Sequence, residues 1–198
     1  MASLDFEAEK QKFRDWYDEN ADRLKRALTT YKVLITQLLS GHQKLTLPIV
    51  SGRIKYREEC IAKFSRKYQA RCEQENLPYE IRSFLTDILG VRAVCLYESE
   101  IDAIRETVFT EFDVVDVTDK SATLEAYDDT FGYKGLHLDL RLKDPRTGLS
   151  EYKQLVELPF ELQIRTTVQD AWSVLDHKIK YKKNIPGSLK RRINRLAA

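Results

Sequence analysis

The segment Phe160–Arg165 (FELQIR) decides the fold, because apolar and polar side chains alternate along it without a break. Side chains of a β-strand point to opposite faces in turn, so its apolar residues share one face. The other face carries an acid, an amide and a guanidinium, namely Glu161, Gln163 and Arg165. Alternation of this kind is typical of a strand with one buried face. We therefore predict a strand over residues 157–165 with a chemically varied polar side.

A second segment, Leu136–Leu142 (LHLDLRL), repeats the pattern with leucine at every other position. Its polar face carries His137, Asp139 and Arg141. Residues 91–97 (VRAVCLY) form a compact β-prone run of the kind found in strands that are buried on both faces. Shorter strands are predicted at residues 49–55 and 113–117.

Helices are predicted where apolar residues recur at spacings of three and four. The longest covers residues 4–40, either as one helix or as two that break near residues 18–22. Strands and helices interleave without repeats or linkers, so we predict a single α+β (mixed α/β) domain. The remaining predicted helices cover residues 58–74, 80–85, 98–112 and 167–182, and Pro186 begins another.

The composition excludes several classes of protein. Of the 198 residues, 42% are apolar and 32% are charged, which is the balance of a globular chain. No apolar run approaches the roughly 18 residues that span a bilayer, and the charged N-terminus lacks the apolar segment of a signal peptide. Three scattered cysteines and three histidines argue against a disulfide framework or a zinc site. We expect a cytoplasmic protein with reduced thiols and no membrane partner.

Charge is distributed unevenly along the chain. Residues 51–71 carry seven bases and two acids, residues 98–129 carry eleven acids and two bases, and residues 178–195 carry eight bases and no acid. Clustered Lys and Arg side chains are what a polyanion requires, so the two basic segments suit a phosphate-binding cleft. The alternative for each segment is a solvated helix face.

Two carboxylates near the predicted strands indicate a metal site. Asp87 precedes the buried run, and Glu161 lies on the polar face of its strand. Mg²⁺ takes one or two carboxylates together with substrate phosphates, so this pair suits that ion. Tyr133 offers a ring for stacking on a base. The alternative is an ordinary sheet face with ion pairs. The cations available for phosphate oxygens are Arg53, Lys55, Lys63 and Arg165.

Several blocks taken together resemble the synthetase domain of the RelA/SpoT family, the alarmone synthetases. Their order and spacing match over about residues 45–185, and the combination is specific although each block alone is weak. Residues 1–44 then form an N-terminal helical cover, and residues 186–198 begin a C-terminal helix that we expect to be truncated. The blocks are residues 51–67 (SGRIKYREECIAKFSRK), 87–92 (DILGVR), 132–137 (GYKGLH) and 161–166 (ELQIRT), followed by Gln169, Trp172, His177, Tyr181 and Lys182.

The resemblance implies a nucleotidyltransferase-like mixed β-sheet flanked by helices. It also implies Mg²⁺-dependent transfer of the β,γ-pyrophosphate of ATP to a ribose 3′-hydroxyl, with release of AMP. Asp87 and Glu161 would engage Mg²⁺, and Glu161 would help to deprotonate the hydroxyl. The residues implied for ATP and its phosphates are Arg53, Lys55, Lys63 and Arg92. Those implied for the acceptor are Tyr133, which would stack on its base, and His137, Gln163 and Arg165.

The chain departs from the family pattern near the acceptor. Asp129 stands where the family usually has a lysine, and Gly135 replaces a serine. An anion at position 129 would repel the phosphates of GDP or GTP. The first hypothesis remains GDP or GTP as acceptor, giving (p)ppGpp. The second is a toxin-type member that modifies the tRNA 3′-CCA end or an adenosine nucleotide, with residues 178–195 against the RNA backbone.

A third hypothesis is an inactive nucleotide-binding module, against which the presence of Asp87 and Glu161 argues. We expect the chain to be a single-domain small synthetase or the catalytic part of a longer protein. The corresponding partners beyond the nucleotides would be a regulatory C-terminal region or an antitoxin.

Overall fold

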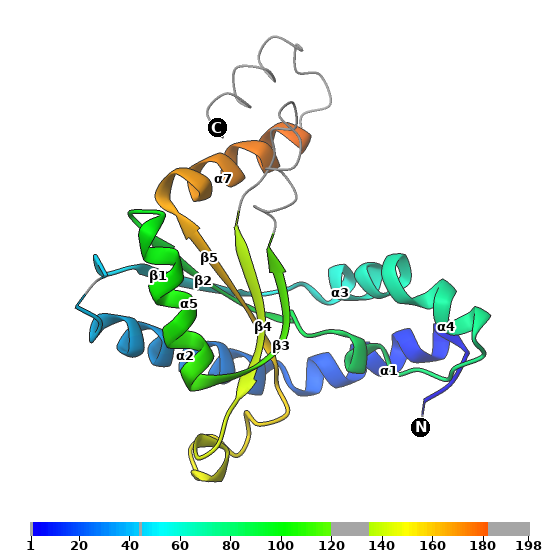
Figure 1. The fold of residues 1–198 in the computed structure, drawn as a ribbon. Coiled ribbons are helices and arrows are strands. Elements are labelled where there is room, and N and C mark those ends of the chain that lie inside the picture. The colour runs from blue at the N-terminus through cyan, green and yellow to red at the C-terminus, as the bar shows by residue number, and fades with distance from the viewer. Residues whose placement is uncertain (1, 44, 120–134, 182–198) are drawn as a thin grey trace.

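The computed structural model describes residues 2–43, 45–119 and 135–181, and for residues 119 and 176–181 it describes the backbone alone. Five strands form one sheet in the order β1-β2-β5-β4-β3 (Figure 1). β2 and β5 run parallel, and the other neighbouring pairs are antiparallel. The strands are β1 (Ile49–Ile54), β2 (Leu89–Cys95), β3 (Phe112–Asp119), β4 (Leu136–Leu142) and β5 (Phe160–Thr166).

Helices precede, connect and follow these strands. The N-terminal pair is α1 (Phe6–Glu19) and α2 (Ala21–Ser40). One continuous stretch comprises α3 (Arg57–Phe64), the π-helical turn η1 (Ser65–Gln69) and α4 (Ala70–Gln74). The others are η2 (Ile81–Phe84), α5 (Ser99–Glu111), η3 (Arg146–Gly148) and α7 (Thr167–Tyr181).

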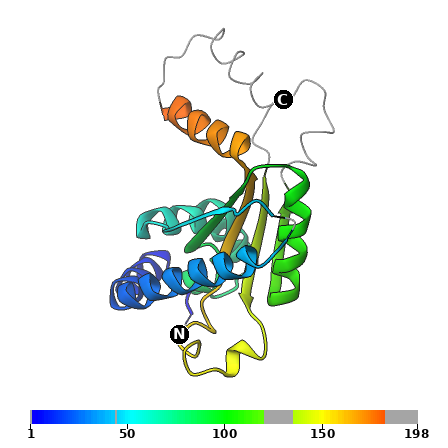
Figure 2. The same ribbon diagram turned by 90° about the vertical axis from the view of Figure 1, so that its left-hand side faces the viewer.

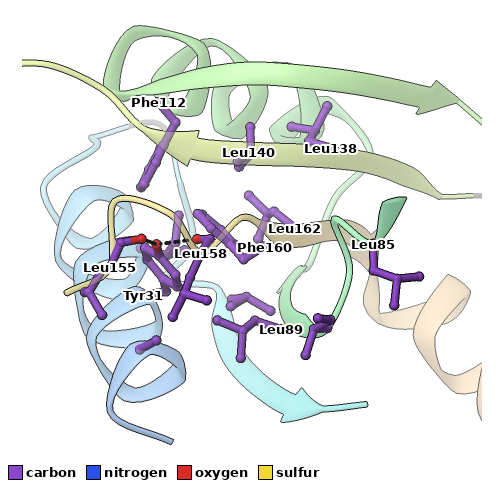
Figure 3. Close-up of a cluster of buried hydrophobic side chains, with 14 of the residues drawn as sticks. Tyr31, Leu85, Leu89, Phe112, Leu138, Leu140, Leu155, Leu158, Phe160 and Leu162 are labelled. Atoms are coloured by element: carbon purple, nitrogen blue, oxygen red, sulfur yellow. Dashed lines mark hydrogen bonds between the residues drawn. The ribbon is translucent and has the colours of Figure 1, made fainter. Parts of the chain in front are cut away.

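The core lies on the apolar face of the sheet. Leucines at alternate positions of β4 are buried together with the apolar residues of β2 and β5. The ring of Tyr31 in α2 stacks on Phe160 with centroids 4.2 Å apart, and Phe112 meets Phe160 edge to face at 5.3 Å (Figure 3). The hydroxyl of Tyr31 lies 2.7 Å from the carbonyl oxygen of Leu158 and 3.1 Å from that of Leu155. This contact ties α2 to the segment that enters β5.

α2 and α5 pack against the apolar side of the sheet, and α3 stands on the other side. α2 and α5 contact the strands and each other, and their buried residues belong to the same core. Figure 2 shows α5 on one side of the sheet and α3 on the other. α3 contacts η2 and α1, so it stands beside the polar face as part of a small helical group.

The predicted fold class is confirmed, and the alternating pattern of β4 and β5 has the predicted meaning. The long N-terminal helix is two helices, with Asn20 between them. The prediction that the last strand starts at residue 157 was wrong, since β5 begins at Phe160 directly after Pro159, which has no N–H to donate. The buried strand runs over residues 89–95, two positions earlier than predicted. The helix predicted from Pro186 falls outside the described residues.

The thiols are free and buried, as expected. Burial raises the pKa of Cys60 to about 12 and that of Cys95 to about 11, so both stay protonated at neutral pH. Among the helices of the described residues, none is long and apolar enough to cross a membrane.

Candidate active site

The strand register aligns polar side chains from four strands in two rows. Residues that pair across strands lie side by side on the same face of a sheet. The first row carries an arginine, a glycine and two carboxylates, and the second carries the amide, the imidazole and a further arginine. In strand order β1-β2-β5-β4, the rows are Arg53, Gly90, Glu161, Asp139 and Ser51, Arg92, Gln163, His137.

Asp87 lies beside the first row, in the turn that enters β2, and is almost fully buried. Its Oδ2 forms ion pairs with Lys55 from the end of β1 and with Lys63 from α3, the latter at 2.7 Å. Burial alone raises the pKa of Asp87, but the hydrogen bonds from Lys55 and Lys63 outweigh burial and lower it. The carboxylate is therefore ionised at neutral pH and lies between two ammonium groups.

The second carboxylate oxygen of Asp87 is available to bind a metal ion. Oδ1 is buried and has no hydrogen-bond partner among the described residues. Within that part of the chain, no group of three or more His, Cys, Asp or Glu side chains is arranged as a metal cage. Mg²⁺ does not require such a cage, because it keeps waters and substrate phosphates beside one or two carboxylates. Asp87 and Glu161 therefore fit Mg²⁺.

Glu161 is held by its neighbours from the second row. His137 Nδ1 lies 2.8 Å from Glu161 Oε1, and the amide of Gln163 donates to Oε2. Burial by itself raises the pKa of Glu161, but the hydrogen bond and charge of His137 and the bond from Gln163 lower it to about 2. Glu161 is thus ionised at any physiological pH, as a metal ligand must be.

Asp139 faces Glu161 across the β4–β5 pair. The hydroxyl of Thr86, the residue before Asp87, donates to Asp139 Oδ2. Burial raises the pKa of Asp139, the Thr86 hydrogen bond lowers it, and the nearby Glu161 charge raises it, so that the net shift is upward. The two facing carboxylates therefore have opposite shifts.

Arg165 and Arg92 share one acceptor on α7. Asp170 Oδ1 lies 2.8 Å from Arg92 Nη1 and 3.3 Å from Arg165 Nη1. Arg165 also donates to Ser173 Oγ at 3.0 Å and to the side-chain oxygen of Gln163. This chain of contacts connects α7 to Glu161 through Gln163 and fixes the second row.

The structure brings most of the residues predicted for the site together. Arg53 lies on the same face in an exposed position, and Arg92 is bound to Asp170 and not to the Asp87 cluster. Tyr133 and Asp129 lie outside the described residues. Asp139 was placed on the polar face by alternation but given no role, and Asp170 was missed. Only its position four residues after the strand, at the start of a helix, could have signalled Asp170.

A mixed sheet flanked by helices, with a lysine-bound aspartate and a glutamate near one face, is suited to hold a divalent cation and phosphate groups. The chain belongs to the RelA/SpoT family. The model of the region found in RelA/SpoT proteins matches residues 52–186. Together with the relatives below, this identifies a pyrophosphotransferase domain of the small alarmone synthetase type.

Two curated relatives are from Bacillus subtilis strain 168. The chain is 32% identical to the GTP pyrophosphokinase YwaC over 163 residues, covering 80% of this chain and 70% of YwaC. It is 30% identical to the GTP pyrophosphokinase YjbM over 153 residues, covering 75% of this chain and 64% of YjbM. The crystal structure of small alarmone synthetase 1 from Bacillus subtilis, bound to its product pppGpp, shares the fold. Its TM-score is 0.67 at 24% identity, covering 93% of this chain and 90% of that one.

Proposed function

We propose that this protein transfers the β,γ-pyrophosphate of ATP to the 3′-hydroxyl of GDP or GTP and so makes (p)ppGpp. The observation that carries the proposal is the pairing of Asp87 with Lys55 and Lys63 beside Glu161 on one face of the sheet. The relatives named GTP pyrophosphokinase, and the solved relative that holds pppGpp, support a guanosine nucleotide as acceptor.

The basic residues of the site are proposed to bind ATP. Lys55 and Lys63 present ammonium groups to the phosphates of ATP, where they stabilise the charge that develops during transfer. Arg53 and Arg92, on the same face, are proposed to bind the rest of ATP. Transfer of phosphoryl-type groups depends on positioning and electrostatic stabilisation more than on covalent chemistry, and this arrangement supplies both.

Asp87 and Glu161 would hold Mg²⁺, which supplies charge neutralisation at the transferring phosphates when bound. On the acceptor side, Glu161 accepts a hydrogen bond from the 3′-hydroxyl and orients it. A carboxylate whose pKa is near 2 is a weak base. Glu161 therefore contributes more by orienting the hydroxyl and binding the metal than by removing the proton. His137 and Gln163 keep Glu161 in place, and Arg165 supports Gln163. Tyr133 is proposed to stack on the base.

A tRNA 3′ end is the second candidate acceptor, because Asp129 occupies a position where the family usually has a lysine. A 3′ terminal nucleotide has no 5′ polyphosphate for that carboxylate to repel. In this version of the function the donor chemistry at Asp87 and Glu161 is unchanged, and the basic residues 178–195 meet the RNA backbone. An adenosine nucleotide is a further alternative acceptor, although Asp129 does not favour it over GDP or GTP.

The acceptor is identified by a transfer assay with ATP labelled in the γ-phosphate. The protein and Mg²⁺ are incubated separately with GDP, GTP, adenosine nucleotides and total tRNA. Label in a guanosine tetra- or pentaphosphate supports the first proposal, and label in tRNA alone replaces it with the second. Asp87→Asn removes one charge from the site without changing its size, and Asp102→Asn on the exposed part of α5 is the matched control. No transfer by the wild-type protein, or transfer that survives unchanged in Asp87→Asn, would overturn both.

A further inference from the structure

A cavity lined by three arginines opens beside the first row of the candidate active site, the row that contains Glu161 and Asp139. Its volume is about 310 Å³, and it lies between the start of β2, the end of β4 and the α1–α2 junction. The charged side chains that line it are Arg23, Arg82, Arg141 and Glu157. The cavity therefore presents three guanidinium groups and one carboxylate.

Two of the arginines are held in place, and the third has no hydrogen-bond or ion-pair partner within the described part of the chain. Arg23 donates to the carbonyl oxygen of Gln154 at 2.7 Å and lies 3.7 Å from Glu157, whose side chain is 83% exposed. Arg82 binds Glu80 at 3.2 Å and lies over the ring of Trp16 at 5.9 Å. Arg141 forms no hydrogen bond or ion pair with any described residue. An unpaired guanidinium beside two anchored ones is suited to bind an oxyanion, because guanidinium matches phosphate in geometry and charge.

Two residues, Thr86 and Arg141, connect the cavity to the face of the sheet that carries Glu161 and Asp139. Thr86 lines the cavity and donates to Asp139, which faces Glu161. Arg141 lies two positions beyond Asp139 on the same face of β4, which places it roughly 7 Å further along the strand. A nucleotide bound at Glu161 is therefore long enough to reach Arg141.

We propose that this cavity is a second phosphate-binding site, separate from the Lys55–Lys63–Asp87 cluster, and that Arg141 is the residue on which binding chiefly depends. The ligand is a phosphorylated molecule. Its phosphate comes either from the acceptor held at Glu161 or from a second phosphorylated ligand that binds on its own. Trp16 forms one wall, so the occupied and empty cavities differ in the environment of its indole ring.

The binding test uses the full chain labelled with 5-fluorotryptophan, which has two fluorine signals, from Trp16 and Trp172. Inorganic pyrophosphate is the probe, and the Trp172→Phe variant assigns the signals. Pyrophosphate is expected to shift the Trp16 signal saturably, and Arg141→Gln is expected to weaken this response by roughly tenfold or more. Arg105→Gln is the matched control, because Arg105 is a half-exposed arginine on α5, and it should leave the response unchanged.

Lys55→Gln separates the two phosphate sites. The proposal requires the Trp16 response to persist in this variant. It is overturned if the Trp16 signal does not move, if Arg141→Gln leaves the dissociation constant unchanged, or if the response disappears in Lys55→Gln. This binding arm does not depend on the proposed function, so the proposed function and the second site can fail separately.

A kinetic arm distinguishes the two sources of the phosphate once binding at Arg141 is established. If the acceptor supplies the phosphate, Arg141→Gln raises the KM for the acceptor while the KM for ATP stays the same. If a separate ligand supplies it, the KM for the acceptor is unchanged in Arg141→Gln, and the two substrates together do not displace pyrophosphate from the Trp16 site.

Discussion

Asp139 and Glu161 face each other across the β4–β5 pair, yet the pKa of one is raised and that of the other is lowered to about 2. Both carboxylates are partly buried, so burial does not distinguish them. The difference comes from their partners, since Glu161 accepts from His137 and Gln163 whereas Asp139 accepts from the neutral hydroxyl of Thr86. Environments that separate the pKa values of two neighbouring acids also separate their roles.

We therefore expect Asp139→Asn to be tolerated and Glu161→Gln to be severely impaired. The asparagine oxygen can still accept from Thr86, so kcat/KM should stay within about threefold of wild type. Loss of the Glu161 charge should lower kcat/KM by about a hundredfold or more. Steady-state transfer rates for the two purified variants check this. Equal impairment of both variants would mean that the facing carboxylates act as one unit.

The low pKa of Glu161 predicts how its contribution to stability depends on pH. Its pKa falls from the ordinary value of 4.5 to about 2 in the folded protein. The ionised carboxylate therefore stabilises the fold above pH 4.5, and this contribution is lost as the pH falls from 4.5 towards 2. It amounts to about 3 kcal/mol at most. Urea unfolding between pH 7 and pH 3 should show the wild type losing stability relative to Glu161→Gln. A constant difference would contradict the shift.

Lys63→Gln should weaken ATP binding. Removing Lys63 leaves the buried Asp87 with Lys55 alone and takes one cation from the place where the phosphates are proposed to bind. We expect the KM for ATP to rise by roughly tenfold, with a smaller effect on the KM for the acceptor. Lys67→Gln is the control, because Lys67 lies one turn further along in η1 and is exposed. Equal effects of the two substitutions would show that general positive charge, and not the Asp87 cluster, attracts ATP.

Asp170 should act as a positioning residue. It accepts from both Arg92 and Arg165, so Asp170→Ala releases two arginines from one anchor. Small displacements of positioning groups are costly, and we expect kcat/KM to fall by between about tenfold and a hundredfold. Asp170→Glu keeps the charge and should restore part of the activity. Failure of Asp170→Glu to exceed Asp170→Ala would contradict this role.

Tyr31→Phe should destabilise the fold without removing activity. The buried hydroxyl lies within hydrogen-bonding distance of the carbonyl groups of Leu155 and Leu158 (Figure 3). Its loss removes this donor from the Leu158 carbonyl oxygen, whereas the Leu155 oxygen still accepts from the Leu158 N–H at 2.8 Å. The free energy of unfolding should fall by about 1–3 kcal/mol, while the stacking of the ring on Phe160 is retained. Urea unfolding and a transfer assay at low temperature measure the two quantities. An active site that fails with the fold still intact would show that this contact also positions β5.

Strand alternation is a local property, so the sequence could predict which side chains share a face of the sheet. The alternation of β4 and β5 placed His137, Glu161 and Gln163 on one face, and the structure joins these three by hydrogen bonds. The pairing of strands is not local, so nothing in the sequence put Asp139 opposite Glu161 or Thr86 against Asp139. The π-helical turn over Ser65–Gln69 was also not predicted. It interrupts the helix for only five residues, which is too short to change the spacing of apolar residues visibly.

The arginine cavity could not have been predicted for the same reason. Arg23, Arg82 and Arg141 come from separate parts of the chain and are no part of any basic run. Only the tertiary arrangement of the α1–α2 junction beside the ends of β4 and β2 brings them together. The first basic segment, residues 51–71, is visible in the sequence, and two of its lysines, Lys55 and Lys63, both bind Asp87.

The most direct test of the central claim is to measure both products of one reaction, with ATP, GDP and Mg²⁺ as the only additions. Pyrophosphate transfer at this site predicts guanosine tetraphosphate and AMP in equal amounts, and a loss of both in Asp87→Asn while Asp102→Asn forms them at the wild-type rate. Formation of ADP in place of AMP would show transfer of a single phosphate. That result, or equal product in wild type and Asp87→Asn, would contradict pyrophosphate transfer at this site.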